Sequence, residues 1–210
     1  MRSVKPAWAI VPAKSLVRGK SRLGGVLDAD ARASFARGLL EHVLGVLGAC
    51  DLAGVLVATD GDDVAELARA HGALVRRDRG EGSLAAVVDG SLADVAGRGA
   101  RAAVVMMADL PRVEVGDVRA LIGALDGCDV ALVRDHLGHH TNALALAPPQ
   151  AILTSFGQPR SFALHLESAR KAGLRVQVVE NERVAFDVDG PADLARLASE
   201  PPSRIAGNAR

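Results

Sequence analysis

The chain has 210 residues, of which 49% are hydrophobic and only 2% are aromatic. The 25 Lys and Arg residues balance the 25 Asp and Glu residues. This zero net charge, with so few aromatic rings for base stacking, argues against nucleic acid as a partner. No apolar run approaches the length that crosses a bilayer, so we expect no membrane partner either.

Apolar runs alternate with helical patterns along the chain. Strands are expected, in chain order, at Trp8–Val11, Val55–Thr59, Ala73–Arg76, Ala102–Met107, Val130–Val133, Asn142–Ala147 and Arg175–Val179. Helices are expected at Asp30–Ala49, Val64–Ala70, Ser83–Val95, Val115–Leu125, Ser161–Ala172 and Pro191–Ala198. The alternation predicts an α/β fold of three layers, a mostly parallel sheet with helices on both faces. The strands Asn142–Ala147 and Arg175–Val179 are candidates for antiparallel pairing.

No break in composition divides the chain, so we expect one domain over residues 1–200 and a frayed tail over 201–210. Cys50 and Cys128 lie far apart in sequence and are expected to be reduced thiols. The N-terminus lacks the apolar core of a signal peptide. These features predict a cytoplasmic protein.

The first strand ends abruptly in a basic loop that carries Lys14, Arg18, Lys20 and Arg22. Glycines interrupt this loop, which lets backbone amides approach an anion. Loops at the carboxyl ends of strands are where open α/β sheets bind ligands. The loop is therefore a candidate phosphate site, although a solvated basic surface is the alternative. The Gly-x-x-x-x-Gly-Lys-Ser/Thr pattern of P-loop ATPases is absent.

Acidic residues follow two later segments. Asp109 comes directly after the most continuous apolar run, and Asp187 and Asp189 lie two residues apart, so in extended chain they face the same side. Mg²⁺ prefers oxygen ligands and commonly takes one or two carboxylates beside substrate phosphates, so these three residues are candidate magnesium ligands. The alternatives are a helix N-cap or a turn for Asp109 and a helix cap for Asp189. For Asp193 we expect a place in the first turn of the last helix.

Two polar segments are candidates for substrate contact. The run Asp135-His-Leu-Gly-His-His-Thr-Asn142 has no zinc-site spacing, but its imidazoles, hydroxyl and amide can all donate to oxyanions. The run Phe156-Gly-Gln-Pro-Arg-Ser161 precedes a helix, with Ser161 as the expected N-cap and Arg160 as a bidentate phosphate donor. His165, within that helix, is expected to be a core or surface residue.

Eight motifs occur together in a fixed order. They are Pro12-x-Lys14, Lys20-Ser-Arg-Leu23, Ala108-Asp-Leu-Pro111, Thr141-Asn-Ala-Leu144, Phe156-Gly157, Ser161-Phe162, His165 and Asp187-x-Asp189-x-Pro191-x-Asp193-Leu194. This ordered set, from about Trp8 to about Leu197, resembles the 2-phospholactate guanylyltransferase family of deazaflavin coenzyme biosynthesis. The resemblance implies a Rossmann-like nucleotidyltransferase fold, that of the nucleotide-diphospho-sugar transferases.

The resemblance also implies a reaction. GTP and a phosphorylated three-carbon acid (2-phospholactate, phosphoenolpyruvate or 3-phosphoglycerate) would give a guanylyl diphospho-acid and pyrophosphate. By this resemblance, Mg²⁺ is held by Asp109, Asp187 and Asp189. Phosphates face Lys14, Lys20 and Arg22, and the nucleotide side includes Pro12, Ala13 and Gly82. The acceptor side is expected at Thr141, Asn142, His139, His140, Gly157, Arg160 and Ser161.

Three motifs depart from the family pattern. His139-His140-Thr-Asn stands where the family usually has Gly-Gly-Thr-Asn, and Phe-Gly-Gln-Pro-Arg-Ser161 is one residue longer than Phe-Gly-x-Gly-Ser. Both departures fall on the acceptor side, so our hypothesis is an acceptor that differs from that of relatives or is held differently. Gly82-Ser-Leu-Ala-Ala86 lacks the Asn of Gly-Leu-Asn-x-Ala, so the choice of GTP comes from the resemblance alone.

Two other functions stay open at this point. A nucleotidyltransferase for a molybdopterin or sugar phosphate would favour a Gly-rich motif before the lysine, where this chain has Pro12-Ala-Lys14. A non-catalytic sensor of a nucleotide or phospho-acid would have no need of three metal-binding carboxylates. A downstream transferase that receives the product is a further expected partner, and the chain is expected to be a monomer or a homodimer.

Overall fold

The computed structural model describes residues 7–78, 80 and 82–199. Within them, seven strands form one sheet with the order β3-β2-β1-β4-β6-β5-β7. The strands are β1 (Ala7–Pro12), β2 (Gly54–Thr59), β3 (Leu74–Arg77), β4 (Ala102–Met106), β5 (Val130–Arg134), β6 (Thr141–Leu146) and β7 (Val176–Val178). In this sheet only β6 runs antiparallel to its neighbours, β4 and β5. The predicted mostly parallel sheet is confirmed.

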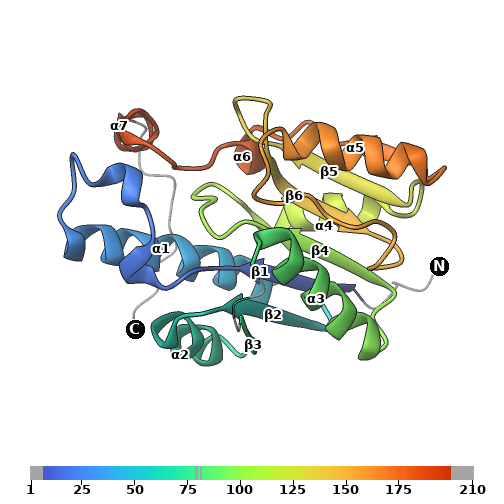
Figure 1. Ribbon diagram of the computed structural model, residues 1–210, viewed down its shortest axis with the longest axis horizontal. Coiled ribbons are helices and arrows are strands. Elements are labelled where there is room, and N and C mark those ends of the chain that lie inside the picture. Colours follow the sequence, from blue (N-terminus) through green and yellow to red (C-terminus); the bar gives the residue numbers. More distant parts are fainter. Residues whose placement is uncertain (1–6, 79, 81, 200–210) are drawn as a thin grey trace.

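Helices cover both faces of the sheet. They are α1 (Ala29–Gly48), α2 (Asp62–Ala70), α3 (Leu84–Gly97), α4 (Val115–Ala124), α5 (Ser161–Lys171), α6 (Glu182–Ala185) and α7 (Pro191–Ser199). Helices α1, α2, α4 and α6 supply side chains to the core on one face, and α3 and α5 supply them to the core on the other (Figure 1). The predicted three-layer α/β fold is therefore confirmed. None of the described helices is both long and apolar enough to cross a membrane.

The central strand β4 separates the two cores. Val104 and Met106 belong to the core under α1 and α4, whereas Ala103 and Val105 belong to the core under α3 and α5. All five residues of the strand are buried, as the continuous apolar run predicts. Full burial of a valine side chain stabilises a fold by about 1.5–3 kcal/mol, so this strand contributes strongly without any aromatic residue.

The sheet topology gathers several loops at one edge. Strands β1, β2 and β4 are parallel, so their carboxyl ends all lie at that edge. Strand β6 is antiparallel to β4, so it begins there, and the Met107 amide donates to the carbonyl of Asn142 at 3.0 Å. Segments from residues 13, 60, 107 and 141 onward thus meet at one place, the usual ligand-binding edge of an open sheet.

Two local expectations are wrong. Strand β7 pairs parallel with β5 and not antiparallel, because the chain returns through α5 and so crosses over before pairing. Ser161 is the first residue of α5 and not its N-cap, since Arg160 takes the cap position in a left-handed conformation, with a φ of 60°. Helix α6 and two 3-10 turns, Leu16–Arg18 and Ser21–Leu23, were not expected from the pattern.

The last expectations concern the two cysteines and the C-terminal end of the chain. Cys50 and Cys128 are both free thiols, as expected. Helix α7 has no buried residue and begins near the loop that follows β1 (Figure 1). The expected frayed tail, 201–210, lies outside the described residues.

Candidate active site

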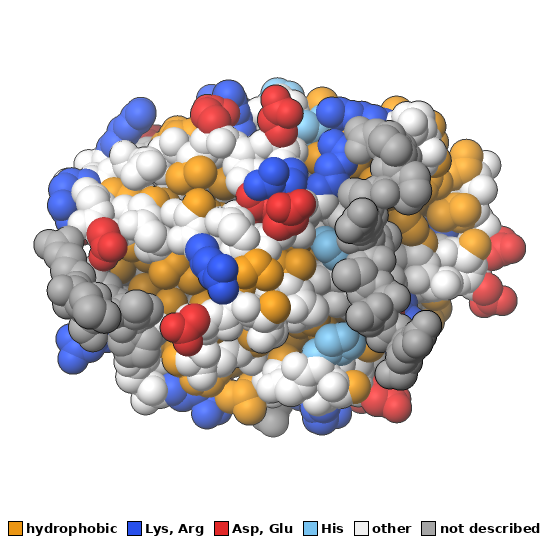
Figure 2. Space-filling model, turned by 180° about the vertical axis from the view of Figure 1, so that it is seen from behind, with side chains coloured by type: hydrophobic (Ala, Val, Ile, Leu, Met, Phe, Trp, Pro, Cys, Tyr) orange, Lys and Arg blue, Asp and Glu red, His pale blue; other side chains and the backbone are white. Residues whose placement is uncertain are grey.

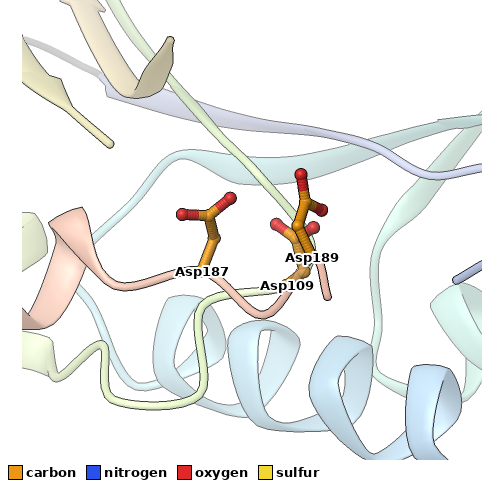
Figure 3. Close-up of side chains that lie close together, drawn as sticks. All are labelled: Asp109, Asp187 and Asp189. Atoms are coloured by element: carbon orange, nitrogen blue, oxygen red, sulfur yellow. The ribbon is translucent and has the colours of Figure 1, made fainter. Parts of the chain in front are cut away.

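Three carboxylates meet at the ligand-binding edge. Asp109 lies in the loop after β4, and Asp187 and Asp189 lie in the extended segment before α7. One carboxylate oxygen from each falls within 4.8 Å of the others, and the three groups point to the same side of the segments that carry them (Figure 3). Asp109 lies there because β4 ends at that edge, whereas Asp187 and Asp189 follow α6, so their meeting with Asp109 is what the family resemblance predicts.

Two basic side chains from the loop after β1 neutralise part of this acidic group. Lys20 Nζ lies 2.5 Å from Asp109 Oδ2 and 3.5 Å from Asp189 Oδ1, and its side chain is only 11% exposed. Arg22 Nη1 lies 3.0 Å from Asp189 Oδ2. The ammonium group of Lys20 therefore sits where the carboxylates converge.

The carboxylates perturb the protonation of their neighbours. Burial acts to lower the pKa of Lys20, but the charge of Asp109 and its hydrogen bond to the ammonium group outweigh burial and raise that pKa. Burial, followed by the charge of Asp109, raises the pKa of Asp187 above its usual range. Crowded carboxylates of this kind are stabilised by a cation. Three convergent oxygen donors fit the ligand chemistry of a divalent cation.

The basic loop is held by carboxylates of the segment after β2. The backbone amide of Ser15 donates to Asp60 Oδ1 at 3.0 Å, and the amide of Leu16 donates to Asp63 Oδ2 at 2.8 Å. Arg18 Nη2 lies 2.6 Å from Asp60 Oδ2. Neither aspartate was predicted from the sequence, since their partners lie more than forty residues away. The one signal was the Asp60-Gly-Asp-Asp63 run from the end of β2 into α2.

Asp187 has two further side-chain partners. Asn142 Nδ2 donates to Asp187 Oδ1 at 3.2 Å, and His136 Nδ1 lies 3.3 Å from the same oxygen. His136 Nε2 also lies 3.3 Å from Asp193 Oδ1, so this imidazole bridges the two carboxylates. Asp193 Oδ2 accepts from the amides of Asp189 and Gly190 at 3.1 and 2.9 Å, so Asp193 has the helix-start role expected of it.

A cavity of about 970 Å³ opens beside the acidic group. Of the residues singled out in the sequence, its lining includes Pro12, Ala13, Lys14, Lys20, Arg22, Gly82, Asp109, Gly157 and Asp189. Gly157 has a φ of 80°, and an added Cβ would lie 3.1 Å from Leu84 Cβ, so glycine suits this wall on both counts. The basic loop, the acidic group and the Gly157 segment thus surround one space.

The other residues expected on the acceptor side lie outside the lining of this cavity. Thr141 and Ser161 are buried, and the amide of Thr141 donates to Ser161 Oγ at 3.2 Å. The side chains of His139 and His140 are exposed, while their backbone amides donate to Asp135 Oδ1 at 2.6 and 2.9 Å. These two histidines close a turn around Asp135 through their backbone, and His140 Nδ1 also lies 3.3 Å from Asp135 Oδ2.

His165 is a core residue, one of the two places that the sequence allowed for it. Its side chain is fully buried, and burial lowers the pKa of the imidazole from 6.5 to about 4. The amide of Ser155 donates to its Nε2 at 2.7 Å, and its Nδ1 lies 2.9 Å from Thr141 Oγ1. Sequence analysis did not predict this network, which joins β6, α5 and the segment before Gly157.

Known proteins resemble this chain both in sequence and in fold. The sequence model of the family described as "Guanylyl transferase CofC like" matches residues 7–200. The chain belongs to this family. This membership confirms the resemblance to the guanylyltransferases of deazaflavin coenzyme biosynthesis and favours a guanylyltransferase over a sugar-phosphate or molybdopterin nucleotidyltransferase and over a non-catalytic sensor.

Individual relatives of the family support the same conclusion. The chain is 43% identical over 191 residues to the phosphoenolpyruvate guanylyltransferase of Rubrobacter xylanophilus, covering 90% of this chain and 92% of that one. It is 34% identical over 186 residues to the 2-phospho-L-lactate guanylyltransferase of Halorubrum lacusprofundi, covering 87% of this chain and 80% of that one.

The fold also matches solved structures. The structure of a putative nucleotide-diphospho-sugar transferase from Desulfovibrio desulfuricans G20 superposes with a TM-score of 0.79 at 19% identity, covering 94% of this chain and 89% of that one. CMP:2-keto-3-deoxy-manno-octonic acid synthetase in complex with CTP superposes with a TM-score of 0.64 at 18% identity, covering 91% and 96%. The nucleotidyltransferase fold that the resemblance implies is therefore confirmed.

Proposed function

We propose that this member of the CofC-like family transfers GMP from GTP to the phosphate of a small phosphorylated acid, with release of pyrophosphate. The observation that carries the proposal is the meeting of Asp109, Asp187 and Asp189 with Lys20 and Arg22, all of which except Asp187 line one cavity. A cavity with both signs of charge suits a triphosphate that carries a divalent cation.

In the reaction, an oxygen of the acceptor's phosphate attacks the α-phosphorus of GTP. A new P–O–P bond forms as the bond to the β-phosphate oxygen breaks, and the electron pair leaves with pyrophosphate. A phosphate monoester is largely ionised at neutral pH, so the attacking oxygen needs no general base. The protein's part is alignment and neutralisation of charge.

We assign the charged groups as follows. Mg²⁺, held by Asp109, Asp187 and Asp189, would neutralise charge on the phosphate oxygens. Lys20 and Arg22 exchange their carboxylate partners for phosphate oxygens, and Lys14 faces the triphosphate from the cavity lining. On the nucleotide side, Pro12, Ala13 and Gly82 offer backbone close to the ligand.

For the acceptor we infer phosphoenolpyruvate first, because this is the substrate in the names of several relatives that cover nine-tenths of the chain. The alternatives for a direct test are 2-phospholactate and 3-phosphoglycerate. The acceptor side comprises Gly157 and Arg160. Thr141, Asn142 and Ser161 belong to it indirectly, because their buried side chains hydrogen-bond the chain segments around the site.

The test is pyrophosphate release by the purified protein with each of the four nucleoside triphosphates, with and without each acceptor. We expect release only with GTP and only when an acceptor and Mg²⁺ are present, and a guanylylated acid by mass spectrometry. Release with CTP or with a sugar phosphate would contradict the proposal, and so would turnover that survives chelation of divalent ions.

The setting of the enzyme is part of the proposal. We infer action in the cytoplasm, where GTP is available and where Cys50 and Cys128 stay free. A transferase that consumes the energy-rich diphosphate product is the expected partner. Figure 2 shows one face of the molecule, on which basic and acidic side chains are interspersed. Such a surface suits small-molecule substrates better than nucleic acid.

A further inference from the structure

His165 has no part in the chemistry described above, yet it is the most deeply buried titratable side chain beside the cavity. Its side chain is 0% exposed. Its ring packs against Phe156, with 4.8 Å between the ring centroids. Phe156 itself lines the cavity.

The two hydrogen bonds of His165 fix its tautomer. The backbone amide of Ser155 can only donate, so Nε2 must be the accepting nitrogen. Nδ1 of the neutral ring then carries the proton and donates to Thr141 Oγ1. Burial keeps the ring neutral well below neutral pH, in agreement with this assignment.

These two bonds tie together two separate parts of the site. Ser155 leads directly into residues 156–158, which form one wall of the cavity. Thr141 begins β6, and the next residue, Asn142, donates to the carboxylate of Asp187. His165 is thus the junction between a cavity wall and the strand that orients a candidate metal ligand.

The wall at residues 156–158 differs in charge from the part of the cavity lining that the loop after β1 supplies. The loop after β1 brings cations to the cavity and is held by Asp60 and Asp63. The 156–158 wall offers neutral groups and is held from behind by His165. A triphosphate suits the cationic wall, which leaves the 156–158 wall, followed along the chain by Arg160, for the second substrate.

We propose that His165 is a positioning residue for the acceptor, because it fixes the 155–158 wall against the start of β6. This inference rests on the proposed function, which already places Gly157 on the acceptor side, and deepens it by naming the residue that holds that wall in place. Loss of the bond to Ser155 should therefore weaken acceptor binding while GTP binding stays unchanged.

Two substitutions separate the two bonds. In His165→Gln the side-chain oxygen reaches the Nε2 position and can accept from Ser155. In His165→Asn the amide group reaches only the Nδ1 position and can donate only to Thr141. His42→Gln is the matched control, since His42 is a half-buried histidine that bonds a single carbonyl, that of Val113, at 3.0 Å.

The readouts are KM for phosphoenolpyruvate, KM for GTP and hydrogen exchange of amides 155–158. For His165→Asn we expect an acceptor KM raised about tenfold, as for loss of one buried hydrogen bond, with the GTP KM within about twofold. Exchange at Ser155 should accelerate. His165→Gln should recover most of both effects, and His42→Gln should match the wild type.

Equal rises in both KM values, or unchanged acceptor KM and exchange in His165→Asn, would overturn the inference. If His165→Asn fails to fold, His165→Leu fills the same space without an acceptor for the Ser155 amide and should raise the acceptor KM alone. If the wild type transfers GMP to no acceptor, the proposed function fails. Exchange at residues 155–158 then still decides whether His165 holds the wall: retained protection in His165→Asn overturns that role.

Discussion

Two polar clusters lie at the same edge of the sheet, and they are built in opposite ways. The charged cluster combines Lys20 with Asp109 and Asp189, whose side chains are 11%, 20% and 48% exposed. The neutral cluster combines Thr141 and His165 with Ser161, all 2% exposed or less. In the neutral cluster each group meets its partner by hydrogen bonds that involve no net charge.

The difference follows from the cost of burial. Neutral polar groups that bond one another can be buried completely at little cost, and they then form a rigid unit. Buried ion pairs recover their desolvation cost only in part, so charged groups keep contact with water or with a ligand. The charged cluster is thus the part that can exchange partners with substrate, while the neutral cluster keeps the cavity in shape.

The largest expected effect breaks the charged cluster. Asp109→Asn keeps the shape of the side chain but removes the charge that faces Lys20 and the proposed Mg²⁺. We expect kcat/KM to fall by at least about a thousandfold, as for other losses of preorganised charge stabilisation. The rate of pyrophosphate release at low substrate concentration measures this fall in kcat/KM.

The control for that substitution is Asp94→Asn, which removes a carboxylate that pairs with Arg76 on the surface. Its activity should stay within about twofold of the wild type. If Asp109→Asn were as active as Asp94→Asn, Asp109 would have no place in the site.

The next prediction tests the neutral cluster by pH. The folded state keeps His165 neutral down to a pKa of about 4, whereas the ring in the unfolded chain protonates near 6.5. The unfolded chain therefore binds more protons between these values. The free energy of unfolding should decrease as the pH falls from about 6.5 to about 4, with a His165 contribution of about 3 kcal/mol.

Urea unfolding at about pH 7 and about pH 4.5 measures this loss. Carboxylates such as Asp117, whose pKa is lowered by its bonds to Arg183 and Asn181 against the effect of burial, add their own acid sensitivity. The loss of unfolding free energy between the two pH values should therefore be compared between the wild type and His165→Gln. The same slope in both proteins would show that His165 is not the group responsible.

A third prediction concerns Lys20, the cation within the acidic group. Lys20→Met should lower kcat by about a hundredfold, because one charged contact to the transferred phosphates is lost. The same substitution should tighten Mn²⁺ binding in the absence of GTP, by about tenfold, since the carboxylates lose their internal counter-ion.

Calorimetry with Mn²⁺ measures the second effect, and Lys171→Met is the control. Lys171 pairs with Glu167 on the surface of α5, at 2.7 Å. That variant should change neither kcat nor Mn²⁺ affinity. Weaker Mn²⁺ binding by Lys20→Met would mean that Lys20 supports the metal site and does not compete for it.

What the sequence could predict follows the same division between the clusters. The place of Asp109 was predictable, because parallel strands bring their carboxyl ends to one edge whatever their separation in sequence. Asp189 follows α6 and no strand, so only the family resemblance predicted that it meets Asp109. The network of Thr141, Ser161 and His165 was not, because its hydrogen bonds depend on how α5 packs on the sheet. The left-handed Arg160, which displaces Ser161 from the cap, also has no local sequence signal.

The smallest expected effect tests the departure at His139 and His140. The sequence led to the hypothesis that these side chains change how the acceptor is held. In the structure both side chains are exposed, and the contacts to Asp135 Oδ1 come from their backbone amides, which glycine keeps. Glycine loses the contact of His140 Nδ1 with Asp135 Oδ2, at 3.3 Å. The double variant His139→Gly, His140→Gly should therefore change the acceptor KM by less than about threefold, the modest cost of a more flexible turn.

Steady-state kinetics with phosphoenolpyruvate and 2-phospholactate would check this, with Asp135→Asn as the comparison that weakens the turn itself. A change of tenfold or more in the acceptor KM of the double variant would mean that the imidazoles reach the bound acceptor. The neutral side of the site would then have to rearrange when the acceptor binds.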